Sequence, residues 1–145
     1  MADDDPAVSV CFSVTIGDKE LGTFISCEGL GVEVVLEQRE EGGFNSQVWQ
    51  LPTRLKYPNI KLTRPLGKDT EKVTKWFATM ATGYQRMTGT IQAMRADGQV
   101  IAQWGLLDVV PVRWTGPALN PDQPKIVTET IEIAHHGFLS PGGTQ

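Results

Sequence analysis

The segment AVSVCFSVTIG, residues 7–17, alternates between apolar side chains and small polar ones. Successive side chains of a β-strand point to opposite faces of the sheet, so a period of two predicts a strand with one face turned to a core. The opposite face carries no charge. The apolar face comprises Val8, Val10, Phe12, Val14 and Ile16, and the uncharged face comprises Ser9, Cys11, Ser13 and Thr15.

The segments that follow predict more strands, separated by turns. GDKELG at 17–22 predicts a turn. Four strand candidates come next. The last two are each expected to stop at a proline, because proline cannot donate a hydrogen bond to a neighbouring strand. The candidates are TFISCEG (23–29), GVEVVLEQRE (31–40), SQVWQLP (46–52) and NIKLTRP (59–65).

The segment KDTEKVTKWFATMATG, residues 68–83, predicts a helix. Its apolar residues fall at positions i, i+3, i+4 and i+7, a spacing that places them on one face of a helix. Asp69 or Thr70 can cap the start, and Gly83 suits a left-handed position at the end. The apolar face comprises Val73, Trp76, Phe77 and Met80.

The C-terminal half of the chain predicts a hairpin, a loop and a final strand. Asp97-Gly98 lies between two strand-like runs, and this pair is preferred in type I′ turns. TGPALNPDQP at 115–124 predicts a proline-rich loop, and KIVTETIEIAHHGF at 125–138 predicts a strand. One face of that strand comprises Val127, Ile131 and Ile133. Taken together, these elements predict a mainly β domain of antiparallel strands with one α-helix.

The length and composition indicate one soluble domain. The chain has 145 residues, of which 40% are hydrophobic and 21% charged, an ordinary globular composition. We expect a single domain over 1–145, with flexible tails at 1–7 and 139–145. The net charge of −4 argues against specific nucleic-acid binding. No apolar run approaches the roughly 20 residues of a membrane helix, so no membrane anchor is expected.

The N-terminal segment and the cysteines indicate the compartment. MADDDPAV is acidic and has no apolar run of the kind found in secretory signal peptides, so we expect a cytoplasmic protein. Cys11 and Cys27 are then expected to be reduced thiols without a ligand, since the cytosol keeps thiols reduced.

No pattern in the chain predicts catalysis. A G-x-S-x-G motif is absent, and Leu62 stands where a phosphate-binding loop needs its first glycine. His135 and His136 are adjacent, so on a strand they point to opposite faces and cannot easily share a metal; we expect one buried and one exposed. The sequence thus predicts neither an enzyme nor a metal or cofactor. A solvated rim is predicted for Glu37, Glu40 and Glu41, and packing in the core or an interface for Trp49, Trp104 and Trp114.

Charge is divided along the chain. Residues 1–45 carry ten acidic residues against two basic ones, a balance of −8, whereas residues 54–95 carry nine basic residues against two acidic ones, a balance of +7. Two interpretations remain open. The two regions neutralise each other within one subunit, or the acidic region of one copy meets the basic region of the next. The second is a head-to-tail contact, which produces rings or filaments.

Four blocks follow one another between about Val8 and Phe138: FSVTIGDKELGTFISCEGLGVEVVLEQREEGG, LPTRLKYPNIKLTRPL, the helix with Trp76, and VVPVRWTGPALN with IVTETIEIAHHGF. In this order they resemble the tail tube protein family of contractile phage tails and contractile injection systems. The chain departs from the family's common pattern at Arg64-Pro65 and at Val109-Val110-Pro111, which affects loop details.

The resemblance implies a fold and an assembly. The fold is two packed antiparallel sheets, a β-sandwich or half-barrel, with one helix. Six copies form a ring in which the sheets of neighbouring subunits join into one continuous barrel around a channel, and rings stack into an inner tube inside a contractile sheath. The implied partners are other copies of the chain, the sheath protein, baseplate and spike proteins, and cargo in the channel.

The resemblance also assigns a role to residues 39–65. A long hairpin around a glycine pair reaches the neighbouring ring, and we expect residues 39–46 to become ordered only there. Attraction of the acidic pair before the glycines to a basic stretch of the next copy is the expected contact. The predicted contact residues are Glu40, Glu41, Gly42, Gly43, Phe44, Asn45, Arg54, Lys56, Lys61 and Arg64.

Three alternatives remain. Within the family, the chain could initiate the tube at the baseplate, or form lone rings as in type VI secretion. From a different class, it could be a monomeric β-barrel that binds a small ligand. A stable monomer with a deep pocket favours the ligand binder, and rings or hollow rods favour the tube protein.

Overall fold

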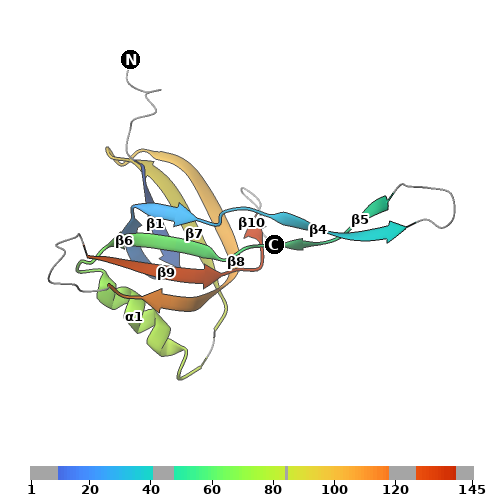
Figure 1. Cartoon of the computed structure of the whole chain (residues 1–145). Helices are drawn as coiled ribbons and strands as arrows, with labels where there is room; N and C mark the ends of the chain where they lie inside the picture. Colours follow the sequence, from blue (N-terminus) through green and yellow to red (C-terminus); the bar gives the residue numbers. More distant parts are fainter. Residues whose placement is uncertain (1–9, 41–47, 84, 118–126, 140–145) are drawn as a thin grey trace, which may run out of the picture.

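Ten β-strands and one α-helix make up the part of the chain that the structure describes, residues 10–40, 48–83, 85–117 and 127–139 (Figure 1). The structure is a computed structural model, and for residues 39, 40, 48 and 49 it describes the backbone alone. The elements are β1 (Val10–Ile16), β2 (Lys19–Phe24), β3 (Ser26–Glu28), β4 (Glu33–Glu40), β5 (Val48–Lys56), β6 (Ile60–Pro65), α1 (Thr70–Thr79), β7 (Met87–Arg95), β8 (Val100–Thr115), β9 (Thr128–Ala134) and β10 (Phe138–Leu139).

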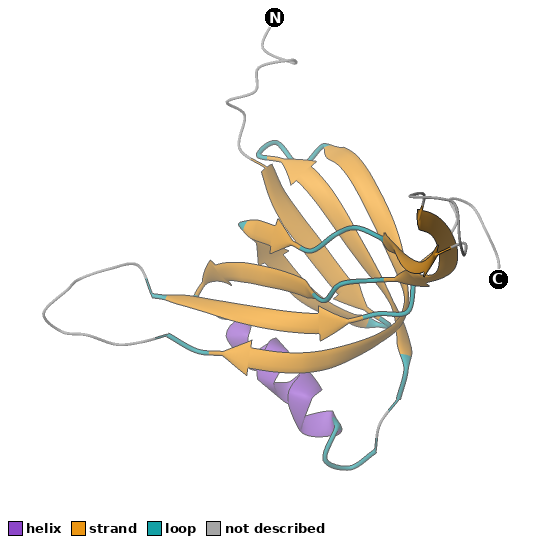
Figure 2. Cartoon of the chain, turned by 45° about the vertical axis from the view of Figure 1, so that its right-hand side comes forward, coloured by secondary structure: helices purple, strands orange, loops and turns teal. Residues whose placement is uncertain are grey.

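Strand β8 joins the two layers of the body. Seven strands lie side by side in the order β2-β1-β7-β8-β9-β6-β3, and β10 pairs with β8 outside this path. The first half of β8, up to Val109, pairs with β7, and its second half, from Val110, pairs with β9. The sheet therefore folds over along β8 into two antiparallel layers, which Figure 2 shows as a half-barrel. This confirms the predicted mainly β fold with one helix.

The core lies between the two layers. Val14 and Ile16, on the predicted apolar face of the first strand, are fully buried, whereas Val10 at the start of that strand is 39% exposed. Helix α1 packs at one end of the body and buries Val73 and Trp76, two residues of its predicted apolar face (Figure 2). The remaining buried core residues are Leu21, Phe24, Ile60, Leu62, Ile91, Leu106, Val109, Ile131 and Ile133.

The turn between β7 and β8 lies where Asp97-Gly98 predicts it, but its type differs. A type I′ turn needs a positive φ at both central residues. Gly98 has a φ of 89°, whereas Asp108 is the only described non-glycine residue with a positive φ. The amide of Gly98 donates to the Arg95 carbonyl, and the Asp97 carboxylate accepts from the amide of Gln99. The loop is therefore a longer one that ends in a left-handed glycine.

Three further expectations about element boundaries are wrong. The predicted turn at 17–22 is confined to Gly17 and Asp18, because β2 already starts at Lys19. Strand β5 continues through Pro52, which is possible because β5 pairs on one side only. Helix α1 starts where predicted, with Asp69 as its N-cap residue, although the Asp69 side chain makes no capping hydrogen bond; the predicted end is wrong, because the C-cap is Met80, three residues before Gly83.

Candidate assembly site

Strands β4 and β5 form a hairpin that stands away from the body, which we call the arm. Within the described residues the two strands pair with each other and with no other strand. Figure 1 shows the arm extending sideways from the half-barrel. The hydroxyl of Thr53 donates to the Val35 carbonyl at 2.8 Å, at the point where the register shifts between Val35 and Leu36. The arm therefore holds its shape through contacts between its own two strands.

The two faces of the arm differ in polarity. Residues directly opposite in an antiparallel pair share a face. On one face Val34 lies opposite Leu55 and Leu36 lies opposite Pro52; we call this the apolar face. On the other face Glu33 lies opposite Lys56, Val35 opposite Arg54 and Glu37 opposite Leu51, so charged and apolar residues are mixed there; we call it the charged face. The exposed fractions on the apolar face are 48% for Val34, 47% for Leu36 and 55% for Leu55, so the subunit itself does not bury them.

An aromatic cluster lies at the root of the arm, directly after β5. The ring of Tyr57 lies 5.4 Å from His135 and 5.7 Å from Phe138, measured between ring centroids. His135 is buried and His136 is exposed, as the sequence predicts. Burial lowers the pKa of His135, the backbone of Gly137 raises it, and the nearby His136 lowers it further, so the net direction is downward. The ring of His135 packs against both Tyr57 and Phe138, and so connects the root of the arm to β10.

The predicted contact residues are placed in different parts of the molecule. Strand β4 ends at Glu40, and Arg54 and Lys56 are exposed residues of the arm. Lys61 is exposed on β6 of the body, five positions after the end of the arm. The remaining predicted residues Glu41, Gly42, Gly43, Phe44 and Asn45, and with them the expected ordering of the hairpin tip, lie outside the described residues.

Arg64 lies inside the subunit and is not available for contact with another copy. Only 4% of the residue is exposed. Its Nε donates to Oε2 of Glu129 at 2.9 Å, and its two terminal nitrogens donate to the carbonyls of Leu21 and Asp69. The guanidinium also lies 4.3 Å from the centre of the Phe24 ring, within cation–π range. Arg64 thus links β6 to β9 and β2, and its assignment to the contact set is corrected.

Glu129 is the buried acid that the sequence analysis missed. It is fully buried and accepts hydrogen bonds from Thr70 at 2.6 Å and from the indole of Trp114 at 2.7 Å, besides that from Arg64. Burial alone would raise the pKa of Glu129, but the hydrogen bonds from Thr70, Trp114 and Arg64 and the charge of Arg64 outweigh it and hold the pKa below its ordinary value. The signal was present in the sequence, since Glu129 has the same strand parity as Ile131 and Ile133.

Opposite charges meet within one subunit in several places. Besides the Arg64–Glu129 pair, Lys72 lies 3.1 Å from Asp69, Lys75 lies 3.2 Å from Glu71, and the acid-bearing strand β4 pairs with the base-bearing strand β5. None of these three ion pairs joins the acidic region 1–45 to the basic region 54–95. The two regions meet inside the subunit through strand pairing, where Glu33 lies opposite Lys56 and Glu28 lies opposite Lys61. This favours the first of the two interpretations of the charge division.

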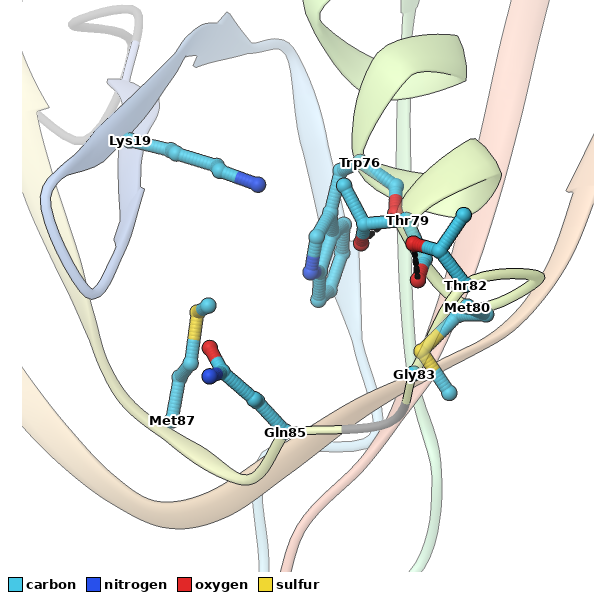
Figure 3. A pocket seen from close by; sticks show the side chains of 8 residues that line it. All are labelled: Lys19, Trp76, Thr79, Met80, Thr82, Gly83, Gln85 and Met87. Atoms are coloured by element: carbon cyan, nitrogen blue, oxygen red, sulfur yellow. Dashed lines mark hydrogen bonds between the residues drawn. The ribbon is translucent and has the colours of Figure 1, made fainter.

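A surface cavity of about 440 Å³ lies between the start of β2, the end of α1 and the segment before β7 (Figure 3). Lys19 reaches over the cavity and the indole of Trp76 forms one wall. The lining residues that the structure describes include no acid, histidine or cysteine. They are Lys19, Trp76, Thr79, Met80, Thr82, Gly83, Gln85 and Met87. The cavity is open on the outside of the body, and it does not resemble the enclosed interior of a ligand-binding barrel.

The two cysteines occupy different surroundings. Both are free thiols in the structure and half-buried. Cys27 packs against the core, and its burial, followed by the charge of Glu28, raises its pKa to about 11. Cys11 lies on the outer face of β1. Within the described ranges there is no group of three or more residues that could hold a metal ion, and no helix with the length and apolar character to cross a membrane.

Cys27 is expected to react with iodoacetamide at pH 7.5 about 10- to 100-fold more slowly than glutathione, because the thiolate is the reactive form and a raised pKa depletes it. Timed alkylation followed by mass mapping of the two cysteine peptides measures this, with Cys11 as the comparison within the same sample. A Cys27 that reacts as fast as glutathione in the folded protein would contradict the expectation. An intact mass two protons short would contradict the separate prediction that both thiols are reduced.

Residues 8–139 match the model of the T4-like virus tail tube protein gp19 family, and the chain belongs to this family. The family resemblance inferred from the sequence is thereby confirmed.

Solved structures share the fold over most of the chain. A chain of the PVC sheath–tube complex of an extracellular contractile injection system, in its extended state, matches with a TM-score of 0.76 and 18% identity, covering 95% of this chain and 93% of that one. A chain of the anti-feeding prophage baseplate matches with a TM-score of 0.74 and 16% identity, covering 95% of each chain. A chain of the anti-feeding prophage tube-terminating cap matches with a TM-score of 0.67 and 21% identity, covering 88% and 84%. Among curated protein sequences, none matches the chain.

Proposed function

We propose that the chain is the subunit of the inner tube of a contractile, phage-tail-like particle. Six copies form a ring, the sheets of neighbouring subunits join into one continuous barrel, and rings stack into a hollow conduit for cargo. The function is mechanical, and no bond is made or broken. Membership of the tail tube family supports the tube, and the half-barrel body supports the joining of sheets, since its curved layer is open at the β2 and β3 edges.

The observation that carries the proposal is the arm. It projects from the body and leaves Val34, Leu36 and Leu55 about half exposed, although Leu and Val side chains are usually buried. Burying what remains exposed of each side chain contributes roughly 1 kcal/mol. Exposed ion pairs contribute roughly 0–1 kcal/mol each. The apolar face is therefore at least as strong a source of adhesion between rings as the attraction of charged residues that the sequence suggested.

The proposed partners follow from the assembly. A contractile sheath protein would surround the tube, and baseplate and spike proteins would meet its end; cargo would occupy the channel. Two of the structural relatives come from a sheath–tube complex and from a baseplate, which supports these partners without identifying them. The particle would assemble in the cytoplasm, where the chain is expected to be synthesised.

Purified protein is expected to form rings of uniform size that stack into hollow rods as the concentration rises. Light scattering after size-exclusion chromatography gives the mass of the ring, and negative-stain microscopy shows the rods. Monomers at every concentration, also in the presence of baseplate components, would contradict the proposal.

A tube-initiating role at the baseplate is the second candidate, because one structural relative is a baseplate chain. The same experiment separates the two roles. A tube subunit extends rods from its own rings, whereas an initiator forms single rings that stack only when a tube subunit is added.

A further inference from the structure

The outer surface of the body is uncharged over one layer. Ser13 on β1 lies beside Gln92 on β7, which in turn lies beside Gln103 on β8. The amide of Gln92 donates to the side-chain carbonyl of Gln103 at 3.1 Å. We call this surface the neutral face, and the nearest acid by register is Glu20, at its border on the edge strand β2. The neutral face comprises Cys11, Ser13, Thr15, Thr90, Gln92, Met94, Val100, Ile101, Gln103 and Gly105.

The outer surface of the other layer carries a row of alternating charges. Glu28 of β3 lies opposite Lys61 of β6, Lys61 lies opposite Glu132 of β9, and Glu132 lies opposite Arg113 of β8. We call these four residues the charged row. The amide of Asn59 also donates to Glu132 at 2.7 Å. The two outer surfaces of one body therefore differ in charge, Glu20 at the border of the neutral face apart, which indicates that they meet different surroundings.

The neutral face fits neither of the two common surroundings of a sheet. A surface buried against another protein usually has large apolar or aromatic residues at its centre. The centre of this face carries Ser13, Gln92 and Gln103, and its large apolar side chains, Met94 and the exposed Val100 and Ile101, lie together at one end. A surface open to bulk water usually carries Lys and Glu, which keep proteins soluble and protect sheets from pairing. Small hydroxyl and amide side chains without charge suit a wall that faces water in a confined space.

We propose that the neutral face lines the channel of the tube, an inference that rests on the proposed function. Symmetry supplies the physical reason. A charged residue at this position would recur in every copy of every ring and would create a strong field of one sign in the channel. Without such charges the wall makes hydrogen bonds and van der Waals contacts to whatever passes. The wall offers a polyanion no Lys or Arg side chains with which to form ion pairs. The channel therefore does not select cargo by the sign of its charge.

Cys11 provides a natural reporter for the proposal, because it lies on the neutral face while Cys27 faces the core. Assembled wild-type tubes, first confirmed by microscopy, are treated with a small maleimide and with a 5-kDa polyethylene glycol maleimide, and the Cys11 peptide is followed by mass mapping. We expect the small reagent to label Cys11 in tubes nearly as it does in free subunits. The large reagent should label Cys11 at least tenfold more slowly in tubes than in free subunits, since the narrow channel excludes it.

Arg113→Cys, at an exposed position of the charged row outside the predicted contact set, is the matched control and should accept the large reagent equally in tubes and free subunits. Two small methanethiosulfonates, one bearing a trimethylammonium and one bearing a sulfonate, test the charge of the channel. If the channel has no fixed charge, the rate at which the cationic reagent labels Cys11, divided by the rate for the anionic reagent, should be the same in tubes as in free subunits, within about twofold. Three results would overturn the inference: rapid labelling of Cys11 by the large reagent, protection from the small reagents as well, or a tenfold change in the ratio of rates. If the protein forms no tubes, the result contradicts the proposed tube function, which is a separate outcome from a failure of the channel assignment.

Discussion

Replacing Arg64 with alanine is expected to destabilise the subunit by about 3–5 kcal/mol, the usual cost of removing one partner from a buried ion pair. The variant leaves the fully buried Glu129 carboxylate without its cation and leaves the carbonyls of Leu21 and Asp69 without their donors. Chemical denaturation followed by circular dichroism measures the free energy of unfolding. Because the network joins β2, β6, β9 and the start of α1, we expect loss of the whole fold rather than of one element.

Lys72→Ala is the matched control for this prediction. It also removes a cation from an ion pair, but the Lys72–Asp69 pair is exposed, with 53% and 27% of the two side chains accessible. Such pairs contribute about 0–1 kcal/mol. If the two substitutions lowered the free energy of unfolding equally, burial of the Arg64–Glu129 pair would not be the reason for the large effect of Arg64→Ala.

The pH dependence of stability gives an independent check. Since the pKa of Glu129 is lower in the folded protein than its ordinary value of 4.5, the folded state binds fewer protons than the unfolded state around that pH. The stabilisation is therefore fully present above about pH 4.5 and is lost as the pH falls through the folded pKa. In Arg64→Ala the carboxylate has lost its cationic partner, so the variant should lose less stability than the wild type when the pH falls. The difference in the free energy of unfolding between wild type and variant should therefore shrink on acidification.

The parts of the fold that the sequence predicts are those in which one side of an element is buried. The alternation in β1 and the helical spacing of Val73 and Trp76 both follow from a core on one side, and both are found. The same alternation in β4 predicts a strand equally well, but it does not say what covers the apolar side chains. In β4 the apolar side chains of Val34 and Leu36 stay about half exposed in the described subunit, because they lie on the arm.

The interactions that the sequence does not predict depend on residues far apart in the chain. Arg64 and Glu129 are separated by 65 positions and are brought together only by the pairing of β6 with β9. A basic residue within a basic stretch resembles a surface charge until its partner is known. The division of charge along the chain therefore suggested contacts between copies, whereas part of it serves the interior of one copy.

Replacing the apolar pair Val34 and Leu55 with lysine and glutamate is expected to abolish the stacking of rings while the subunit stays folded. The two positions lie directly opposite each other, so the new charges can pair across the strands and preserve the hairpin. The apolar surface that we propose to dock on the neighbouring ring is lost, however, and charged groups would have to be desolvated in its place. Sedimentation velocity and negative-stain microscopy measure assembly, and circular dichroism verifies the fold.

The double substitution Glu33→Lys with Lys56→Glu is the control, because it exchanges an opposite pair on the charged face of the same arm, one position away along each strand. If the apolar face forms the joint between rings, this exchange should leave rods of normal length. Salt also separates the two explanations, since ion pairs weaken as ionic strength rises while apolar contacts do not. Rods that survive the Val34 and Leu55 substitutions but disappear on exchange of Glu33 and Lys56 would assign the joint to the charged face, as the sequence first suggested.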